Sequence, residues 1–394
     1  AASDVYKRQV LMVPPMDLSA RHRRCRVCIH VTRHLNGGGH LRGPRRPLAP
    51  LVWVDHHKPR TVAVMRFGIF FELSVPRPLT RGAEQQVYAD ALEQAVLADE
   101  LGFDWVWAVE HHFLEEYSHC SAPELFLTAV AMATKRIRVG HGAVVCVPAM
   151  NHPIRVAERA AVLDILSGGR LELGTARSST WTELGGFAAD PDLTKAWWRE
   201  YVEILPRMWT ETAFSFSGLS CTVPERNVLP KPVQDPHPPM WVTVTTPGTE
   251  LDAADRGLGC LGVAAVSYDE QERRTAEYHR RIANCDPVVS LVNPSVTTQN
   301  FLYCDESLDR AAEVGGAMAA TFGLLNSHLL WTREWYPTDA YRSLGNQATR
   351  AMKETGAPGE RRAPPEGLAI GDPDHVLAEL KRCCLLYTSP SPRD

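Results

Sequence analysis

The stretch "WVWAVEHHF", residues 105–113, leads five largely apolar residues into a glutamate and two adjacent histidines. A short apolar run with β-branched and aromatic residues predicts a buried strand. Glu110, His111 and His112 then stand where this strand ends. In a parallel barrel the chemistry lies at the carboxyl ends of the strands, so three polar side chains here indicate a functional site. The structural alternative is a histidine that caps a neighbouring loop.

Strand-like and helix-like segments alternate on both sides of this stretch. Residues 83–102, for example, carry apolar side chains at helical spacing. Such alternation predicts a parallel sheet covered by helices on both faces. Seven repeats favour an α/β fold with a closed (β/α)8 TIM barrel over a doubly wound sheet, for which a GxGxxG motif between strand and helix is missing. The seven predicted strands are residues 66–73, 103–110, 136–148, 170–177, 238–246, 260–266 and 295–304.

Composition is that of an ordinary globular protein. The chain has 394 residues, of which 44% are hydrophobic and 22% charged, enough for one large α/β domain. No apolar run is long enough to span a bilayer, so no membrane association is expected. Ten cysteines are scattered without a framework, which is typical of the reducing cytoplasm. Cys25 and Cys28 form a single CxxC without a second pair, so no metal site is expected there.

Both ends of the chain are expected to be foreign to the protein. "AASDVYKRQ" (residues 1–9) and "CLLYTSPSPRD" (residues 384–394) back-translate to sequences that resemble the two transposase adaptors of shotgun sequencing libraries. The interpretation is an open reading frame on a short assembled fragment. A native barrel domain is then expected over residues 65–383.

Residues 10–64 are rich in Arg, His, Gly and Pro and show no strand or helix periodicity. Nine Arg and one Lys against two Asp give this segment a charge of +8. A basic arm for nucleic acid is one interpretation. Translated upstream DNA, with the real start at Met65, is the favoured one. Subtracting this charge and the +1 of residues 1–9 from the net −4 leaves −13 for the remainder, which argues against a nucleic-acid partner.

Four stretches of the body resemble the luciferase-like flavin monooxygenases, and in this order and spacing they cover residues 65–382. They are "DELGFDWVWAVEHHF" (99–113), "VGHGAVVCVPAMNHPIRVAERAAVLDILSGGRLELGTARS" (139–178), "MWVTVTTPGTELDAADRGLG" (240–259) and "AIGDPDHVLAELKR" (369–382). The resemblance implies a homodimeric, two-component monooxygenase. A separate NAD(P)H:flavin reductase would supply reduced FMN, and the enzyme would use O2 to put one oxygen atom into a small organic substrate. A deazaflavin oxidoreductase of the same fold and a non-catalytic subunit are the alternatives.

The resemblance also assigns residues. His111 would lie beside the reactive face of the flavin and move a proton there, a task suited to an imidazole. His112 is the less certain partner, and Glu110 is expected to orient an imidazole or to lie solvated at the mouth. Because strand side chains alternate, only one of the two histidines is expected to point into the barrel.

The remaining assignments concern FMN binding. Arg177 ends "ELGTAR" and matches the arginine that holds the FMN phosphate, which suits a bidentate guanidinium. Hydroxyl groups of the turn after the fifth strand would complete the phosphate site together with the following helix. A non-prolyl cis peptide against the flavin is expected between Gly142 and Ala143. The hydroxyl donors are Thr245, Thr246 and Thr249.

Two expectations concern the last third of the chain. Residues 323–367 read as an irregular stretch and match a lid that covers the flavin in relatives; a disordered insertion is the alternative. The resemblance places the eighth strand after the helix of residues 373–382, where the adaptor-like tail begins. The eighth strand is therefore expected to be missing, which would leave a gap between the first and seventh strands.

Overall fold

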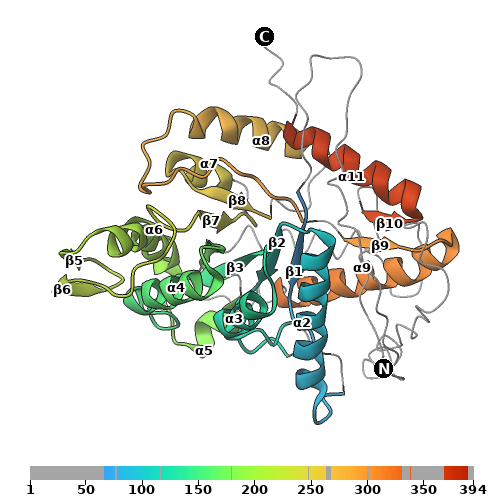
Figure 1. Ribbon diagram of the computed structural model, residues 1–394, viewed down its shortest axis with the longest axis horizontal. Coiled ribbons are helices and arrows are strands. Elements are labelled where there is room, and N and C mark those ends of the chain that lie inside the picture. Colours follow the sequence, from blue (N-terminus) through green and yellow to red (C-terminus); the bar gives the residue numbers. More distant parts are fainter. Residues whose placement is uncertain are drawn as a thin grey trace.

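The computed structural model describes residues 66–75, 78–115, 117–178, 180–246, 248–262, 268–299, 301–330, 338 and 368–388. Its centre is a parallel sheet whose six strands follow one another in the order β1-β2-β3-β4-β7-β8 (Figure 1). Every pairing in this sheet is parallel. The strands are β1 (Gly68–Phe71), β2 (Trp105–Ala108), β3 (Arg138–Val145), β4 (Leu171–Ala176), β7 (Met240–Thr243) and β8 (Gly259–Leu261).

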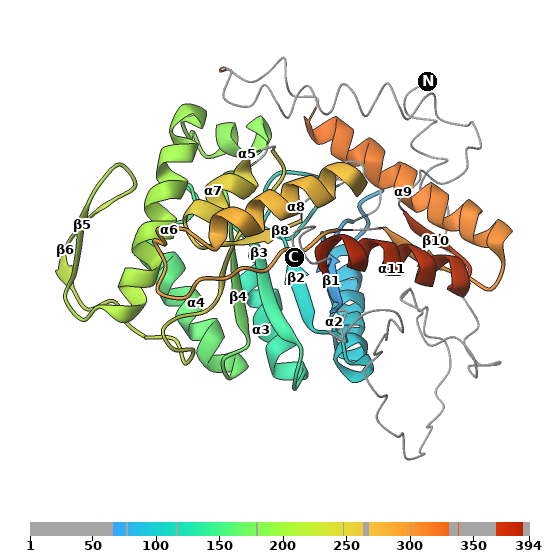
Figure 2. The same ribbon diagram turned by 90° about the horizontal axis from the view of Figure 1, so that it is seen from above.

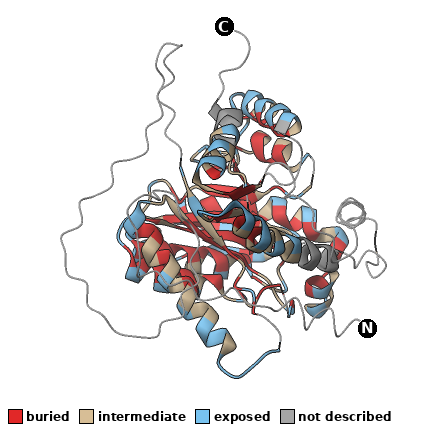
Figure 3. Cartoon of the chain, turned by 90° about the vertical axis from the view of Figure 1, so that its right-hand side faces the viewer, coloured by how far each residue is buried: buried red, intermediate tan, exposed pale blue. Residues whose placement is uncertain are grey.

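Helices connect these strands and cover the outside of the sheet, as parallel connections require (Figure 2). Figure 3 shows buried residues on the strands and exposed ones on the outward faces of the helices. The order is α2 (Ala83–Leu101), α3 (Pro123–Ala133), α4 (Pro153–Ser167), α5 (Trp181–Gly186), the 3-10 turn η1 (Pro191–Leu193), α6 (Thr194–Thr210), α7 (Thr249–Asp255), α8 (Tyr268–Ile282), α9 (Leu308–Leu330) and α11 (Pro373–Thr388).

The sheet is curled, and two tryptophans demonstrate the curl. Trp107 of β2 and Trp241 of β7 meet edge to face with ring centroids 5.6 Å apart, although β3 and β4 lie between their strands. Leu261 completes this small cluster on the concave side. Gly140 of β3 makes room for it, because a Cβ atom there would lie 2.1 Å from the Trp107 ring. The interior of the curl is thus filled by large side chains, as in small barrels.

Two short strands outside the main sheet bear on the predicted eighth strand. β9 (Leu302–Cys304) and β10 (Ala369–Gly371) pair in parallel as a sheet of their own. With the six central strands they make eight parallel strands in the described part of the chain. The predicted loss of the eighth strand is therefore not confirmed, and β10 comes before α11 rather than after it. In the described pairings the ladder does not run on from β8 to β9, since residues 295–297 lie beside Cys260 instead.

Other predicted boundaries also change. The seventh strand was predicted over residues 295–304, but only Leu302–Cys304 form β9. Residues 323–330, predicted as the start of an irregular lid, instead continue α9. The four leucines of "LLNSHLL" (residues 324–330) favour a helix. Residues 331–367, except 338, lie outside the described residues, as do 1–65 and 389–394. The hairpin of β5 (Phe214–Ser217) and β6 (Thr222–Arg226) was not predicted. It lies beside α6, at the end opposite to β9 and β10 (Figure 1).

Candidate active site

A pocket opens at the carboxyl ends of the central strands, with about 840 Å³ of empty space, open solvent included. Seven of the predicted site residues line it: Glu110, His111, Ala143, Arg177, Thr245, Thr246 and Thr249. They come from the ends of β2, β3, β4 and β7 and from the first residue of α7. Side chains that were not predicted complete the lining: Val109, Val145, Ala176, Ser178, Lys195, Trp198, Val242, Thr243 and Asp252.

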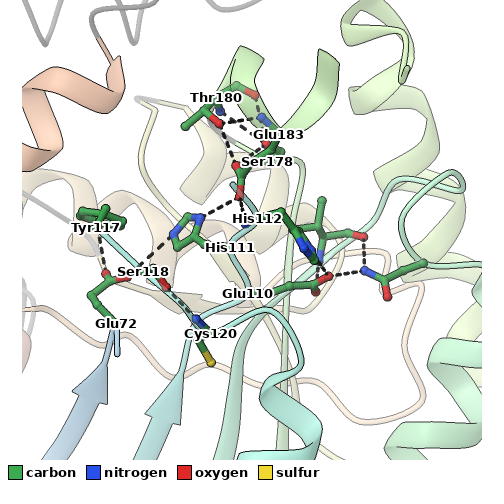
Figure 4. A network of polar contacts seen from close by, with 12 residues as sticks. Glu72, Glu110, His111, His112, Tyr117, Ser118, Cys120, Ser178, Thr180 and Glu183 are labelled. Atoms are coloured by element: carbon green, nitrogen blue, oxygen red, sulfur yellow. Dashed lines mark hydrogen bonds and ion pairs between the residues drawn. The ribbon is translucent and has the colours of Figure 1, made fainter. Parts of the chain in front are cut away.

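His111 is anchored through one ring nitrogen. Its Nδ1 lies 2.9 Å from Oε1 of Glu183, which also accepts the backbone N–H of His112 at 3.0 Å (Figure 4). The second oxygen of Glu183 accepts the hydroxyls of Ser178 and Thr180 at 2.8 and 3.0 Å. Burial opposes the charge on Glu183, but these bonds outweigh it and lower its pKa. An ionised Glu183 accepts the Nδ1 proton, which leaves Nε2 of His111 as the nitrogen that titrates.

A second carboxyl group faces that Nε2. Glu72 directly follows β1, and its Oε2 lies 3.8 Å from Nε2 of His111. Its other oxygen accepts the hydroxyl of Tyr117 at 2.9 Å, and the Tyr117 ring meets the His111 ring nearly edge on. Burial lowers the pKa of His111, but the bond to Glu183 and the charges of Glu183 and Glu72 outweigh it, so that pKa is raised.

Glu110 and His112 form a separate contact. His112 Nε2 lies 3.2 Å from Oε1 of Glu110, and the same oxygen accepts the side-chain amide of Asn151 at 2.6 Å. Oε2 accepts the backbone N–H of Val145 at 2.9 Å. Burial opposes the charge on Glu110, yet the contacts with His112 and His141 lower its pKa well below the usual range. Glu110 thus ties β2 to β3, and the imidazole that it orients is that of His112, which is not among the pocket-lining residues.

Strand β3 contributes backbone to the pocket wall. The peptide bond between Gly142 and Ala143 is cis, at the position predicted from the sequence. Ala143 lines the pocket, whereas a Cβ at Gly142 would point toward Leu261 and Trp107, each 3.1 Å away. The register between β3 and β4 shifts in this region, between His141 and Val144.

The opposite side of the pocket carries cationic and hydroxyl groups. Arg177 follows β4, and Lys195 reaches the pocket from α6 with its ammonium 3.0 Å from Asp252. Thr245, Thr246 and Thr249 lie beside them in and after the turn that follows β7. Within the described residues, the hydroxyl of Thr243 is buried and has no hydrogen-bond partner, which is unusual for a buried polar group.

The turn that holds these threonines is fixed by a buried ion pair. Arg274 of α8 binds Glu250 through two bonds of 2.7 and 2.6 Å, and both side chains are less than a tenth exposed. Glu250 also accepts the backbone N–H of Gly248 at 3.0 Å. Thr249 lies between Gly248 and Glu250 in the chain. Arg274 of α8 therefore positions Thr249 through its bonds to Glu250.

Sequence reasoning missed Glu72, Tyr117, Glu183 and Lys195. Glu72 had a usable signal, because it is an acidic residue directly after a buried strand, as Glu110 is. Glu183 had none: it bonds to a side chain 72 residues earlier. No group of His, Cys, Asp and Glu that could hold a metal ion occurs in the part of the chain that the structure describes. None of the described helices is long and apolar enough to cross a membrane.

Comparisons with known proteins identify the family and agree with the fold. The profile of the luciferase-like monooxygenase family matches residues 65–384. The oxygenase component of the flavin-dependent trigonelline monooxygenase of Acinetobacter baylyi is 27% identical over 256 residues, which are 64% of this chain and 69% of that protein. Over the first curated relatives, the chain spans from about half to about seven tenths of the relative's own length.

Two solved structures share the architecture. The monooxygenase RslO1 from Streptomyces bottropensis is 27% identical with a TM-score of 0.63, over 82% of this chain and 89% of that one. An F420-dependent secondary alcohol dehydrogenase is 20% identical with a TM-score of 0.57, over 80% of this chain and 89% of that one. At that identity the second likeness concerns the fold alone. Flavin- and deazaflavin-dependent enzymes therefore both occur among the proteins that this chain resembles.

Proposed function

The chain belongs to the luciferase-like monooxygenases, and from this premise we propose that it is the oxygenase of a two-component system. It takes reduced FMN from a separate NAD(P)H:flavin reductase and uses O2 to transfer one oxygen atom to a small organic substrate. The observation that carries the proposal is His111, held by Glu183 at the carboxyl end of β2 inside the pocket. The trigonelline monooxygenase component of Acinetobacter baylyi supports the two-component reading.

The pocket residues fit FMN by their chemistry. Arg177, Lys195 and the threonine hydroxyls offer cations and donors for a terminal phosphate. Apolar side chains that also line the pocket suit a flat aromatic ring system, and the unpartnered hydroxyl of Thr243 offers a further hydrogen bond. When bound, the reduced flavin supplies the electrons for O2 activation. The apolar lining groups are Val109, Ala143, Val145, Ala176, Trp198 and Val242.

His111 would hold and move the proton in this reaction. Glu183 keeps the Nδ1 proton in place and fixes the orientation of the ring. Nε2 is then free to exchange a proton with a group bound in the pocket. The bonds that satisfy Glu183 keep it ionised, so the ring orientation is preserved while Nε2 titrates.

The test mixes the protein with reduced FMN without oxygen, admits air and follows the flavin absorbance. We expect a transient spectrum distinct from both reduced and oxidised FMN. His111→Ala should shorten the lifetime of this transient at least tenfold. The control is His152→Asn, which changes an exposed histidine at the start of α4 and should leave the transient unchanged. Reoxidation of FMN in the wild type at the rate of free FMN would refute the proposal.

The same experiment separates the two coenzyme classes. A deazaflavin transfers hydride and does not activate O2, so a deazaflavin enzyme would oxidise reduced F420 only when an acceptor substrate is present. If F420 binds with a dissociation constant at least tenfold below that of FMN, the coenzyme is a deazaflavin and the proposal of FMN is wrong. Failure to bind either coenzyme would favour a non-catalytic subunit.

We also propose that the protein forms a homodimer in the cytoplasm through α3 and α4. These neighbouring helices expose apolar side chains, and large exposed apolar groups often mark an interface. Sedimentation equilibrium should give twice the chain mass, and Leu125→Lys with Met132→Lys should give a monomer that is still folded. A monomeric wild type would contradict the dimer. The exposed side chains are Leu125, Met132, Val162, Ile165 and Leu166.

A further inference from the structure

We propose that Glu72 is a positioning residue of this site that shares a single proton with His111. In this arrangement the proton lies either on Nε2 of His111 or on Oε2 of Glu72, and Tyr117 keeps Glu72 in place. The inference rests on the proposed function, because it takes His111 as the group that exchanges a proton with the bound reactants. It extends that function by identifying what sets the proton affinity of His111.

The geometry of Glu72 is the first argument. Oε1 is occupied by the Tyr117 hydroxyl at 2.9 Å, so Oε2 is the oxygen that faces His111 at 3.8 Å (Figure 4). Oε2 is buried and has no hydrogen-bond partner among the described residues. Burying a carboxylate oxygen without a donor is unfavourable. A proton on Oε2 neutralises the carboxyl group, and a proton on the facing Nε2 places an opposite charge 3.8 Å away, so either reduces that penalty.

The rest of the cluster determines where this proton can be. Glu183 has four donors and accepts the Nδ1 proton, so neither Glu183 nor Nδ1 is a place for it. The backbone N–H of His111 is bonded to the carbonyl of Cys120. A proton that this cluster takes up therefore belongs to the facing pair, and its two placements are imidazolium with carboxylate or imidazole with carboxylic acid. No electrons move in this exchange.

The distance sets the condition for transfer. A separation of 3.8 Å is longer than a hydrogen bond, so the Glu72 side chain must turn toward the ring for the proton to cross. The Tyr117 bond holds Oε1 and directs Oε2 during this movement. The Tyr117 ring also touches Phe322 of α9, with centroids 5.7 Å apart, so the Glu72 contact is bounded by an element from the last third of the chain.

The charges around the pair agree with one shared proton. Burial lowers the pKa of His111, but the bond to Glu183 and the charges of Glu183, Glu72 and Glu110 outweigh it and raise that pKa. Burial raises the pKa of Glu72, and His111 and Tyr117 offset only part of this effect. Both groups thus hold a proton more tightly than in water, as expected when two sites compete for one proton.

The test is the titration of the His111 ring by NMR in the flavin-free full chain, labelled at histidine Cε1 and assigned by the signal lost in His111→Ala. Glu72→Gln keeps the shape and the acceptor for Tyr117 but removes the charge. We expect it to weaken the proton affinity of His111 about tenfold, since a nearby opposite charge shifts a pKa by about one unit or more. Glu84→Gln is the matched control, because Glu84 pairs with a different histidine, His119, at 2.8 Å.

The outcomes are separable. A His111 titration midpoint that is the same in Glu72→Gln as in wild type overturns the shared proton, provided circular dichroism shows a folded variant. If Glu72→Gln does not fold, Tyr117→Phe serves instead, and an unchanged midpoint there overturns the inference. A His111 midpoint that shifts in Glu72→Gln upholds the shared proton. If the wild type also reoxidises FMN at the rate of free FMN, the FMN monooxygenase is refuted while the shared proton stands. The reverse combination upholds the monooxygenase and refutes the role of Glu72.

Discussion

Removal of Arg274 is expected to destabilise the fold and to impair the phosphate side of the pocket. Arg274→Met keeps much of the volume, but of the hydrogen bonds to Glu250 described above it leaves only the one from the N–H of Gly248. Both partners are buried, with 6% and 7% of their side chains exposed. Breaking a buried ion pair by removing one partner costs about 3–5 kcal/mol. At a slope of about 3 kcal/mol per M, the urea midpoint should fall by roughly 1–1.7 M.

The affinity for FMN tests whether the ion pair positions Thr249. Glu250 adjoins Thr249, so Arg274→Met should weaken FMN binding at least tenfold while riboflavin, which lacks the phosphate, loses much less. Fluorescence titration measures both affinities. Arg274→Met with Glu250→Gln removes the buried charge and should recover most of the urea midpoint. A loss below about 1 kcal/mol in Arg274→Met, or equal losses for FMN and riboflavin, would refute the reasoning.

Three further changes have defined directions. Gly140→Ala forces a methyl group against the Trp107 ring and should lower the unfolding free energy by about 1–3 kcal/mol; an unchanged urea midpoint would contradict the packing. Gly316→Ala, in α9 with open space around the position, should instead raise it by about 0.5–1 kcal/mol, and a lower thermal midpoint would count against a helical Gly316. Burial lowers the pKa of His237, so the fold favours the neutral ring; its contribution is complete above pH of about 6.5 and is lost as the pH falls below that value. Between pH 7.5 and 5 the free energy of unfolding should therefore fall more steeply with decreasing pH in wild type than in His237→Gln. The same pH dependence in both proteins would refute this.

Much of the fold was predictable because its signals are local. Each central strand is a short apolar run followed by polar residues, and parallel strands gather their ends at one edge. Seven of the nine site residues, most of them implied by the family resemblance, line the pocket at this edge. Strand alternation also predicted that only one histidine of the pair would face inward, and His111 is the one that lines the pocket.

The remaining features depend on contacts distant in sequence. Glu183 becomes part of the site only because α5 folds back over the end of β2, and nothing near residue 183 indicates this. The short β10 was overlooked because three residues carry too little pattern. A further strand after α11 stays a prediction, since residues 389–394 lie outside the described part of the chain. Glu110 contacts an imidazole, as expected, and the structure identifies it as that of His112. Its bonds to Val145 and Asn151 were not predicted, since both partners are distant in sequence.

The division of the hydrophobic interior has a consequence for how the molecule opens. The six central strands share one continuous core, whereas β9 and β10 rest on two small clusters of their own. Segments with few buried apolar contacts exchange their amide hydrogens at a lower free energy than the main core. The β9–β10 unit should therefore exchange first, as a separate cooperative unit. Because Phe322 of α9 contacts Tyr117, each such opening would briefly admit water beside Glu72, while the pocket walls on β2, β3, β4 and β7 stay folded.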